Sequence, residues 1–269
     1  MGEKTKGHLF IIGGAEDKYG DSVILKKVVE AIGGNDANLV ILTTATEKPE
    51  EVGNEYKNVF GRLGMKSINI LDISSRDEAN LEQNSEIIRR ANGIFFTGGD
   101  QLRITSILGG AKVYFAMHEA FENGAVIIGT SAGASAMSST MIVDGNNNDP
   151  ARKCTLKMAP GLGLLDEVII DQHFAQRGRI GRLLCGVAEN PHILGVGIDE
   201  DTAVRVYPDA RFEVVGTNAV TVIDGNTIKT SNVSELKPDE ILAITNVTLH
   251  VLTDGYGYDM KNRRVLSPN

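Results

Sequence analysis

The pentapeptide Gly129-Thr130-Ser131-Ala132-Gly133 constrains the fold of this chain more than any other stretch. It follows the apolar run Ala125-Val126-Ile127-Ile128 and precedes a run of small residues. A G-x-S-x-G pattern between a strand and a helix is typical of a nucleophile elbow, where glycines allow the sharp turn that exposes the serine. The alternative is a Gly/Ser-rich helix start with no chemistry, but strand, glycines and small-residue helix together favour the elbow. We predict that Ser131 is a nucleophile, with free N–H groups of the next helix pointing toward it.

His173 is placed like a general base. It closes the string Asp171-Gln172-His173 after the apolar run Val168-Ile169-Ile170, so we expect it at the carboxyl edge of a sheet, where α/β proteins bind ligands. Another expected strand, Leu194–Ile198, ends in Asp199-Glu200-Asp201 at the same edge. We interpret Ser131 as the nucleophile, His173 as base and then acid, and one of these carboxylates as the group that orients the imidazole. Spacing alone does not choose among Asp199, Glu200 and Asp201.

The order of these residues along the chain is also informative. Ser, His and acid follow one another, whereas the α/β-hydrolases have the order Ser, acid, His. The sequence therefore predicts an elbow without implying that superfamily.

Apolar, β-branched segments alternate with helical patterns over the first two thirds of the chain, which predicts an α/β fold with a mostly parallel sheet. The expected strands are Leu9–Ile12, Leu39–Thr43, Ser67–Leu71, Ile94–Phe96, Ala125–Ile128, Val168–Ile170 and Leu194–Ile198. From Thr202 onward, short alternating strands and turns replace the helices. A chain of 269 residues with 42% hydrophobic content suits one domain. We predict a single unit over 1–269, with a doubly wound core over about 1–201 and an antiparallel β-rich extension over about 202–269 packed on it.

Charge and aromatic content argue against several classes of partner. The net charge is −8 and the chain has no tryptophan, so it lacks both the basic face and the stacking surface of a nucleic-acid-binding protein. No apolar stretch approaches the ~20 residues of a membrane helix. The start of the chain lacks the apolar region of a signal peptide, so the expected location is the cytoplasm.

We expect no metal and no cofactor. The polar loop 144–153 is rich in Asp and Asn and could border the cleft, but it does not match an EF-hand pattern. Gly13-Gly14 follows the first strand without the third glycine of a dinucleotide fingerprint, and Glu16 and Asp17 would repel a pyrophosphate. A structural turn under the active-site edge is the better interpretation of these glycines.

Five strings together resemble the cyanophycinases, which belong with the aspartyl dipeptidases among serine peptidases. They are Ile11-Ile12-Gly13-Gly14-Ala15-Glu16-Asp17-Lys18, Phe96-Thr97-Gly98-Gly99-Asp100-Gln101-Leu102-Arg103, Gly129-Thr130-Ser131-Ala132-Gly133-Ala134, Asp171-Gln172-His173-Phe174 and Gly197-Ile198-Asp199-Glu200-Asp201-Thr202. They occur in the family's order over roughly the first three quarters of the chain. Such a set is far more specific than one G-x-S-x-G.

The resemblance implies a class I glutamine amidotransferase-like (flavodoxin-like) fold and a homodimer. It selects Glu200 as the triad acid. It also implies cleavage of cyanophycin, a poly-aspartate that carries arginine on each β-carboxyl group, with release of β-aspartyl-arginine dipeptides.

The Gly-Gly turn after the strand Ile94–Phe96 could present backbone N–H groups to an anion. We predict that the N–H groups of Gly99 and Ala132 form an oxyanion hole beside Ser131. The alternative is an ordinary turn that ends a strand.

Arg177, Arg179 and Arg182 lie at the start of a helical pattern just after His173. Cations near a helix N-terminus oppose the helix dipole, so their position suggests function rather than helix stability. Guanidinium groups suit bidentate capture of carboxylates, and we expect these arginines to bind the acidic groups of the substrate. The alternative is a solvated basic patch.

Polar residues beside the same loops complete the expected substrate site. Asp100 and Asp171 are candidate partners of a substrate guanidinium, although either could pair with one of the arginines instead. Gln101 and Gln172 are candidate hydrogen-bond partners of the substrate amide, and only the resemblance raises these two above ordinary polar loop residues.

The sequence therefore predicts a cytoplasmic serine peptidase that acts on cyanophycin or an aspartyl peptide through a Ser-His-Glu triad and an acyl-enzyme. Two alternatives stay open: an α-aspartyl dipeptidase of the same family, and a non-catalytic relative that binds peptides. A glutamine amidotransferase is disfavoured because the elbow carries serine where those enzymes use cysteine.

Overall fold

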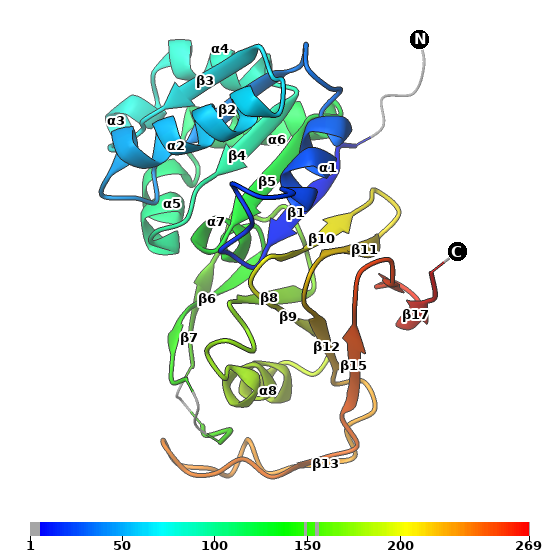
Figure 1. Ribbon diagram of the computed structural model, residues 1–269. Helices are drawn as coiled ribbons and strands as arrows, with labels where there is room; N and C mark the ends of the chain where they lie inside the picture. The colour runs from blue at the N-terminus through cyan, green and yellow to red at the C-terminus, as the bar shows by residue number, and fades with distance from the viewer. Residues whose placement is uncertain (1–5, 148–149, 154–155, 269) are drawn as a thin grey trace.

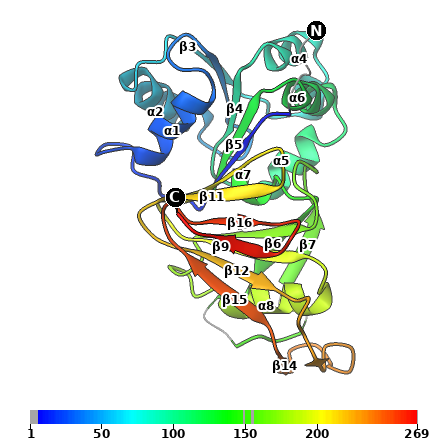
Figure 2. The ribbon, with the colours of Figure 1, turned by 90° about the vertical axis from the view of Figure 1, so that its right-hand side faces the viewer.

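The computed structural model describes residues 6–147, 150–153 and 156–268, which form two main β-sheets with helices around them (Figures 1 and 2). The larger sheet has nine strands in the order β17-β16-β11-β10-β1-β5-β4-β2-β3. Its parallel half consists of β1 (Leu9–Ile12), β2 (Asn38–Leu42), β3 (Ser67–Leu71), β4 (Gly93–Phe96) and β5 (Val126–Thr130). Its antiparallel half consists of β10 (Thr202–Val206), β11 (Arg211–Gly216), β16 (Gly257–Asp259) and β17 (Arg264–Leu266).

A second sheet of four strands has the order β15-β12-β9-β8. It consists of β8 (Val168–Gln172), β9 (Leu194–Ile198), β12 (Val220–Asp224) and β15 (Thr248–Leu252), and only β8 and β9 run parallel. Two smaller antiparallel pairs accompany it: β6 (Thr140–Gly145) with β7 (Leu156–Pro160), and β13 (Thr230–Ser231) with β14 (Ile244–Thr245).

Helices cover both faces of the parallel half, which explains why its inner strands β1, β4 and β5 are buried along their whole length. They are α1 (Val23–Ala31) and α2 (Pro49–Arg62) on one face, and α3 (Arg76–Ala79), α4 (Glu82–Arg89), α5 (Gln101–Leu108) and α6 (Lys112–Glu122) on the other. Because side chains alternate along a strand, Phe10 and Ile12 pack with α1 and α2 while Leu9 and Ile11 join the opposite core.

Two further helices lie nearer the second sheet. The short helix α7 (Ala132–Ser135) follows β5, and α8 (Ile180–Glu189) packs Leu183 and Val187 against Ile169 and Ile223 of that sheet. Within the described part of the chain, every helix is too short or too polar to traverse a lipid bilayer.

The strands expected from the sequence are present, but two of them belong to a different sheet. We expected Val168–Ile170 and Leu194–Ile198 in the parallel sheet, and they form β8 and β9 of the second sheet instead. The reason is that β10 runs back antiparallel along β1 and occupies the edge at which another parallel strand would pair. The fold is therefore α/β with a parallel-rich sheet, as predicted, and carries a second, mixed sheet.

The region after Thr202 contributes strands to both main sheets: β10, β11, β16 and β17 extend the first, and β12 and β15 extend the second, while β13 and β14 form a small pair of their own. The sequence reading missed the β6–β7 hairpin. The polar loop 144–153 begins in β6 at Asp144 and Gly145, and its residues 148–149 lie outside the described residues.

The turn after β1 ties together the loops that follow three other strands. The N–H of His173 donates to the carbonyl of Gly13, the N–H of Asp201 to that of Gly14, and the N–H of Ser131 to that of Ile12, at 2.9, 2.9 and 3.0 Å. This matches the structural turn that the Gly-Gly pair predicts. It also explains how residues far apart in the sequence reach one place.

Substituting Gly13 tests the importance of this turn. A Cβ atom at Gly13 would lie 2.0 Å from the carbonyl oxygen of Asp199 and 2.7 Å from that of Ile198, so the backbone itself would have to move. We expect Gly13→Ala to lower the free energy of unfolding by about 2–3 kcal/mol, measured by urea denaturation.

Gly61→Ala is the matched control, because Gly61 lies in α2 with nothing within 4 Å of the added Cβ. There we expect no loss, and a gain of up to about 1 kcal/mol. A Gly13→Ala protein as stable as the parent would show that the turn has room to adjust.

Candidate active site

Ser131 occupies a strained turn between β5 and α7. Its backbone has φ 52° and ψ −109°, a conformation that L-residues rarely adopt and that persists only where neighbours enforce it. The flanking glycines are required by space: a Cβ at Gly129 would lie 2.5 Å from the carbonyl of Gly133, and one at Gly133 would lie 2.6 Å from the carbonyl oxygen of Phe96. The local structure is therefore a tight strand-to-helix turn that has room only for glycine at positions 129 and 133.

The structure brings Ser131, His173 and Glu200 into one hydrogen-bonded chain. Ser131 Oγ lies 2.9 Å from His173 Nε2, and His173 Nδ1 lies 2.7 Å from Glu200 Oε1. With the proton on Nδ1, the imidazole donates to Glu200 and accepts from the serine hydroxyl. This is the geometry in which a histidine can remove the proton of a serine nucleophile.

Of the three acidic residues that spacing left open, Glu200 contacts His173, and its two neighbours bond to other groups. Asp199 accepts from the N–H groups of Ala175 and Ala219 at 2.9 and 3.2 Å. Asp201 accepts from the N–H of Asp17 at 2.8 Å and from the hydroxyl of Thr217 at 2.9 Å. Both aspartates thus fasten the loop, and Glu200 is the carboxylate that contacts His173.

The environment of His173 favours its neutral form. Burial lowers the pKa of His173 below its ordinary value of 6.5, the hydrogen bond to Glu200 raises it, and the positive charges of Arg177 and Arg179 lower it. Burial is the largest of these effects, so the net shift is downward. A neutral imidazole is the form that accepts a proton.

The two predicted oxyanion-hole residues lie on turns next to the serine. Ala132 directly follows it and begins α7. A Cβ at Gly98 would lie 3.5 Å from the Cβ of Ser131, so the Gly98–Gly99 turn adjoins the elbow. Gly99 has φ 143°, and its own added Cβ would lie 2.1 Å from the carbonyl oxygen of Ala45, so a larger residue would not fit there.

Asp100 and Gln101 each have a partner within the protein. The carboxylate of Asp100 caps α5 by accepting from the N–H of Leu102 at 2.7 Å, and its side chain is exposed. The amide of Gln101 donates to the carbonyls of Ile142 and Val143 at 2.9 and 2.8 Å and so holds β6.

Asp171 forms a buried ion cluster with two of the predicted arginines. Asp171 is 1% exposed; Arg182 binds both of its carboxylate oxygens, and Arg179 Nη1 lies 3.4 Å from one of them. Burial raises the pKa of Asp171 against the opposing effect of the arginines, and burial lowers the pKa of Arg179 to about 10. Pairing of Asp171 with arginine, one of the two options left open by the sequence, is the one present in the structure.

The same cluster holds the β6–β7 hairpin. Arg179 Nε donates to Asn147 Oδ1 at 3.1 Å, and Arg182 Nη1 donates to the carbonyl of Gly145 at 3.3 Å. Gln172 is buried and its Oε1 accepts from Arg179 at 3.1 Å. Arg177, in contrast, is exposed. Burial therefore divides the three arginines into two that join structural elements and one that faces solvent.

Sequence reasoning missed two residues of this region, Gly14 and Glu16. A Cβ at Gly14 would lie 2.5 Å from His173 Nε2, so only glycine leaves room for the imidazole. Glu16 is buried and bonds to Thr130, the residue before the serine. The available signal was the string that contains both residues, which we had interpreted only as a turn.

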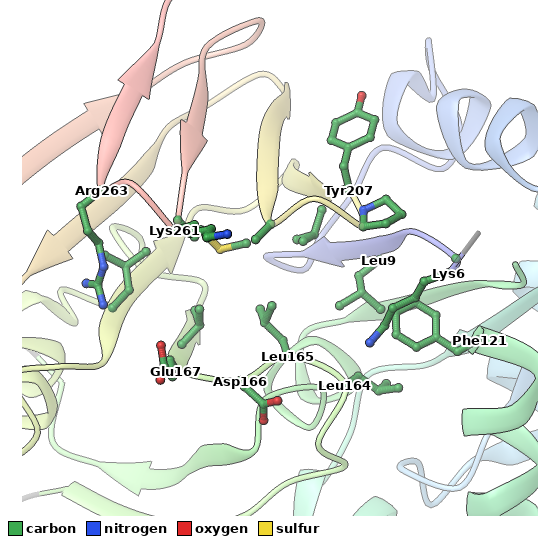
Figure 3. Close-up of a pocket in the computed structure, with 17 residues that line it drawn as sticks. Lys6, Leu9, Phe121, Leu164, Leu165, Asp166, Glu167, Tyr207, Lys261 and Arg263 are labelled. Atoms are coloured by element: carbon green, nitrogen blue, oxygen red, sulfur yellow. The ribbon is translucent and has the colours of Figure 1, made fainter. Parts of the chain in front are cut away.

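A cavity of about 350 Å³ lies away from this site (Figure 3). Its walls include Leu9, Val168 and Leu194, the first residues of β1, β8 and β9, and Figure 3 shows Glu167 and Lys261 beside it. The serine, histidine and glutamate instead follow the carboxyl ends of β5, β8 and β9. The cavity and the hydrogen-bonded chain of Ser131, His173 and Glu200 therefore lie at opposite ends of these strands.

Comparison with curated proteins gives several full-length relatives. The chain is 35% identical to a cyanophycinase of Synechococcus elongatus over 261 residues, which cover 97% of this chain and 81% of that protein. It is 34% identical to a cyanophycinase of Geminocystis herdmanii over 268 residues, covering 99% and 98%. A cyanophycinase of Nostoc is 36% identical over 265 residues, covering 98% and 89%. The resemblance seen in the five strings is thus confirmed over nearly the whole chain.

Solved structures share the fold at lower identity. A peptidase from an acI-B1 Actinobacterium matches with a TM-score of 0.69 and 20% identity over 98% of both chains. A putative peptidase E from Listeria monocytogenes matches with a TM-score of 0.56 and 17% identity, covering 79% of this chain and 100% of that one. At such identities the likeness concerns the fold alone.

The family model for peptidase family S51 matches residues 9–215, a range that contains the serine, the histidine and the glutamate. This match and the full-length relatives agree. The chain therefore belongs to peptidase family S51, a family of serine-type peptidases.

Proposed function

We propose that this protein hydrolyses cyanophycin to β-aspartyl-arginine dipeptides through an acyl-enzyme on Ser131. The observation that carries the proposal is the continuous hydrogen-bonded chain from Ser131 through His173 to Glu200. The relatives named cyanophycinase, which match nearly the full length, supply the substrate. A class I glutamine amidotransferase-like fold, a single domain over 1–269, a homodimer and a cytoplasmic location form part of the same proposal.

The proposed mechanism follows from the positions of the three side chains. His173 takes the proton of Ser131 as the serine oxygen attacks the carbonyl carbon of a backbone peptide bond. It then gives this proton to the leaving amine, and the C–N bond breaks. A water, deprotonated by the same imidazole, attacks the ester carbon; the bond to Ser131 Oγ breaks, the imidazolium returns the proton to this oxygen, and the second product leaves. Glu200 keeps Nδ1 protonated and stabilises the imidazolium that forms in each half-reaction.

The oxyanion of each tetrahedral intermediate needs donors close to Ser131. We assign this role to the N–H groups of Ala132 and Gly99, as the sequence predicts. Two facts support it: Ala132 begins a helix directly after the serine, and the Gly98–Gly99 turn adjoins the elbow. Loss of one such donor typically costs about a hundredfold to a thousandfold in turnover.

The charged groups that remain exposed recognise the substrate. Arg177 is exposed, and its N–H donates to the carbonyl of His173 at 3.1 Å, so it is available for a substrate carboxylate, while exposed Asp100 is available for a guanidinium. The cluster of Asp171, Arg179 and Arg182 contributes by shaping the wall next to the hairpin. Gln101 and Gln172 also contribute by shaping this wall, because the side chain of each hydrogen-bonds to other groups of the protein.

Digestion of purified cyanophycin tests the proposed function. The parent protein should release β-aspartyl-arginine, identified by mass spectrometry, and Ser131→Ala should lose turnover while it still binds the polymer, because only the nucleophile is removed. A fluorophosphonate probe should label Ser131 in the parent and not in the variant. Hydrolysis of short α-Asp-X peptides with no action on cyanophycin would favour the dipeptidase alternative. Absence of both labelling and hydrolysis would leave only a non-catalytic binding role.

The charge on Arg177 should shift the acid limb of the pH profile. His173 must be neutral, so kcat/KM rises as pH increases through its pKa, which lies below 6.5. Arg177 lowers this pKa, so Arg177→Gln should move the acid limb to higher pH. Arg177→Lys keeps the charge and should leave the limb in place. The measurement uses a small uncharged ester, so that substrate groups do not titrate, and a limb that shifts equally in both variants would contradict this account.

The buried arginine should matter more for stability than the exposed one. Arg182→Ala leaves the carboxylate of buried Asp171 without its bidentate partner, and such a change typically costs about 3–5 kcal/mol. Arg177→Ala removes an exposed cation and should change the free energy of unfolding by less than about 0.5 kcal/mol. Urea denaturation measures both. Equal effects would mean that the ion cluster is not what holds this part of the fold.

A further inference from the structure

Glu16 is a buried acidic residue beside the elbow that the proposed mechanism does not use. It is 4% exposed and lies in the loop after β1, the same loop whose carbonyls accept hydrogen bonds from His173 and Asp201. A buried carboxyl group costs free energy unless its oxygens are satisfied. Its retention next to a strained serine therefore calls for an explanation.

Both carboxyl oxygens of Glu16 are engaged by hydroxyl groups. Thr130 Oγ1 donates to Oε2 at 2.6 Å, and the hydroxyl of Tyr56 donates to Oε1 at 2.5 Å. The first contact joins the β1 loop to the residue directly before Ser131. The second joins the same carboxyl group to α2, which contains Tyr56.

Tyr56 is itself held firmly. It is 4% exposed, its ring packs on Phe95 and Phe60 with centroids 4.6 and 6.5 Å away, and the ammonium of Lys18 lies 4.4 Å from its ring centre. Burial raises the pKa of Tyr56 well above its ordinary value, so its hydroxyl stays protonated and remains a donor. Glu16 therefore has one fixed partner in the core and one partner in the elbow.

The elbow needs such an anchor because its backbone conformation is unfavourable. Ser131 is bonded to β1 through the carbonyl of Ile12 at 3.0 Å, and Thr130 is bonded to the β1 loop through Glu16. These two contacts hold the consecutive residues Thr130 and Ser131, and both contacts come from the same side of the molecule. Together they determine where the serine hydroxyl meets the imidazole.

We propose that Glu16 is a positioning residue for the nucleophile, which holds Thr130 and so keeps Ser131 at hydrogen-bond distance from His173. This role rests on the proposed serine-peptidase function. It acts on the chemical step and not on substrate binding, since Glu16 is buried and reaches the serine only through Thr130.

Glu16→Gln tests the role with the smallest change in shape. An amide replaces one oxygen acceptor by a donor, so one of the two hydroxyl contacts must weaken or reverse. We expect kcat on cyanophycin, and the rate at which a fluorophosphonate labels Ser131, to fall between about tenfold and a hundredfold, because small misplacements of reacting groups have effects of this size. KM should stay near that of the parent.

Thr130→Val and the double variant test the route. If Glu16 acts through Thr130, the two substitutions are not additive, and the double variant labels at about the rate of the slower single variant. Glu55→Gln is the matched control. Glu55 lies on the same helix as Tyr56, and its carboxylate bonds to Lys18 and Tyr19. Loss of this carboxylate should leave the labelling rate unchanged. All rates are measured well below each variant's melting midpoint.

The outcomes separate the two proposals. If the parent is neither labelled nor active on cyanophycin, the proposed function fails. If the parent is labelled and Glu16→Gln is labelled equally fast, the positioning role fails while the function stands. A double variant whose rate falls by the product of the single effects would also overturn it, because Glu16 would then act by another route.

Discussion

The relative positions of Ser131, His173 and Glu200 depend on three backbone carbonyls at the end of β1 and in the turn after it. Ile12, Gly13 and Gly14 accept hydrogen bonds from the N–H groups of the elbow, the histidine loop and the glutamate loop. These bonds fasten three segments of the chain to one short peptide. In the sequence, the first segment lies more than forty residues from the second, and the second more than twenty from the third. Because a reactive triad requires placement to within a fraction of an ångström, these main-chain contacts achieve what flexible side chains alone would not. They also explain the glycines, since added Cβ atoms would meet the carbonyl of Asp199 and the imidazole of His173.

This arrangement has a conformational cost that the surrounding structure offsets. Ala15, Ser131, His173 and Asp201 have φ values of 48°, 52°, 46° and 47°, although none is glycine. Such conformations cost on the order of 1–3 kcal/mol each and persist where hydrogen bonds and packing over-determine them. Here Ser131, His173 and Asp201 each donate a backbone N–H to the β1 turn. The residues with a strained backbone are therefore the ones that these hydrogen bonds hold in place. This is consistent with a site whose shape is fixed before substrate arrives.

Local patterns predicted the strands, the strand-to-helix turn at Ser131 and the place of His173 at the end of a strand, because each is determined by its neighbours in sequence. They did not determine partners that lie far away. Spacing could not separate Glu200 from Asp199 and Asp201, since the difference lies in contacts with Ala175, Ala219, Asp17 and Thr217. The pairing of β8 and β9 in a second sheet depends on β10 taking the edge of β1, which no local pattern records. For the same reason, Glu16 was interpreted as part of a turn: its function depends on Thr130 and Tyr56, at 114 and 40 residues' distance.

The arginines show why residue type alone cannot assign a role. All three follow His173 closely, and all three oppose a helix dipole, so the sequence treats them alike. Burial separates them, because Arg179 and Arg182 offset the buried charge of Asp171 while Arg177 stays in solvent. The buried and the exposed arginines are nevertheless alike in one respect. Arg177 and Arg179 both lower the pKa of His173, in the same direction as its burial. The cluster that joins the hairpin to the second sheet thus also helps to keep the imidazole neutral, so structure and electrostatics favour the same proton-accepting state.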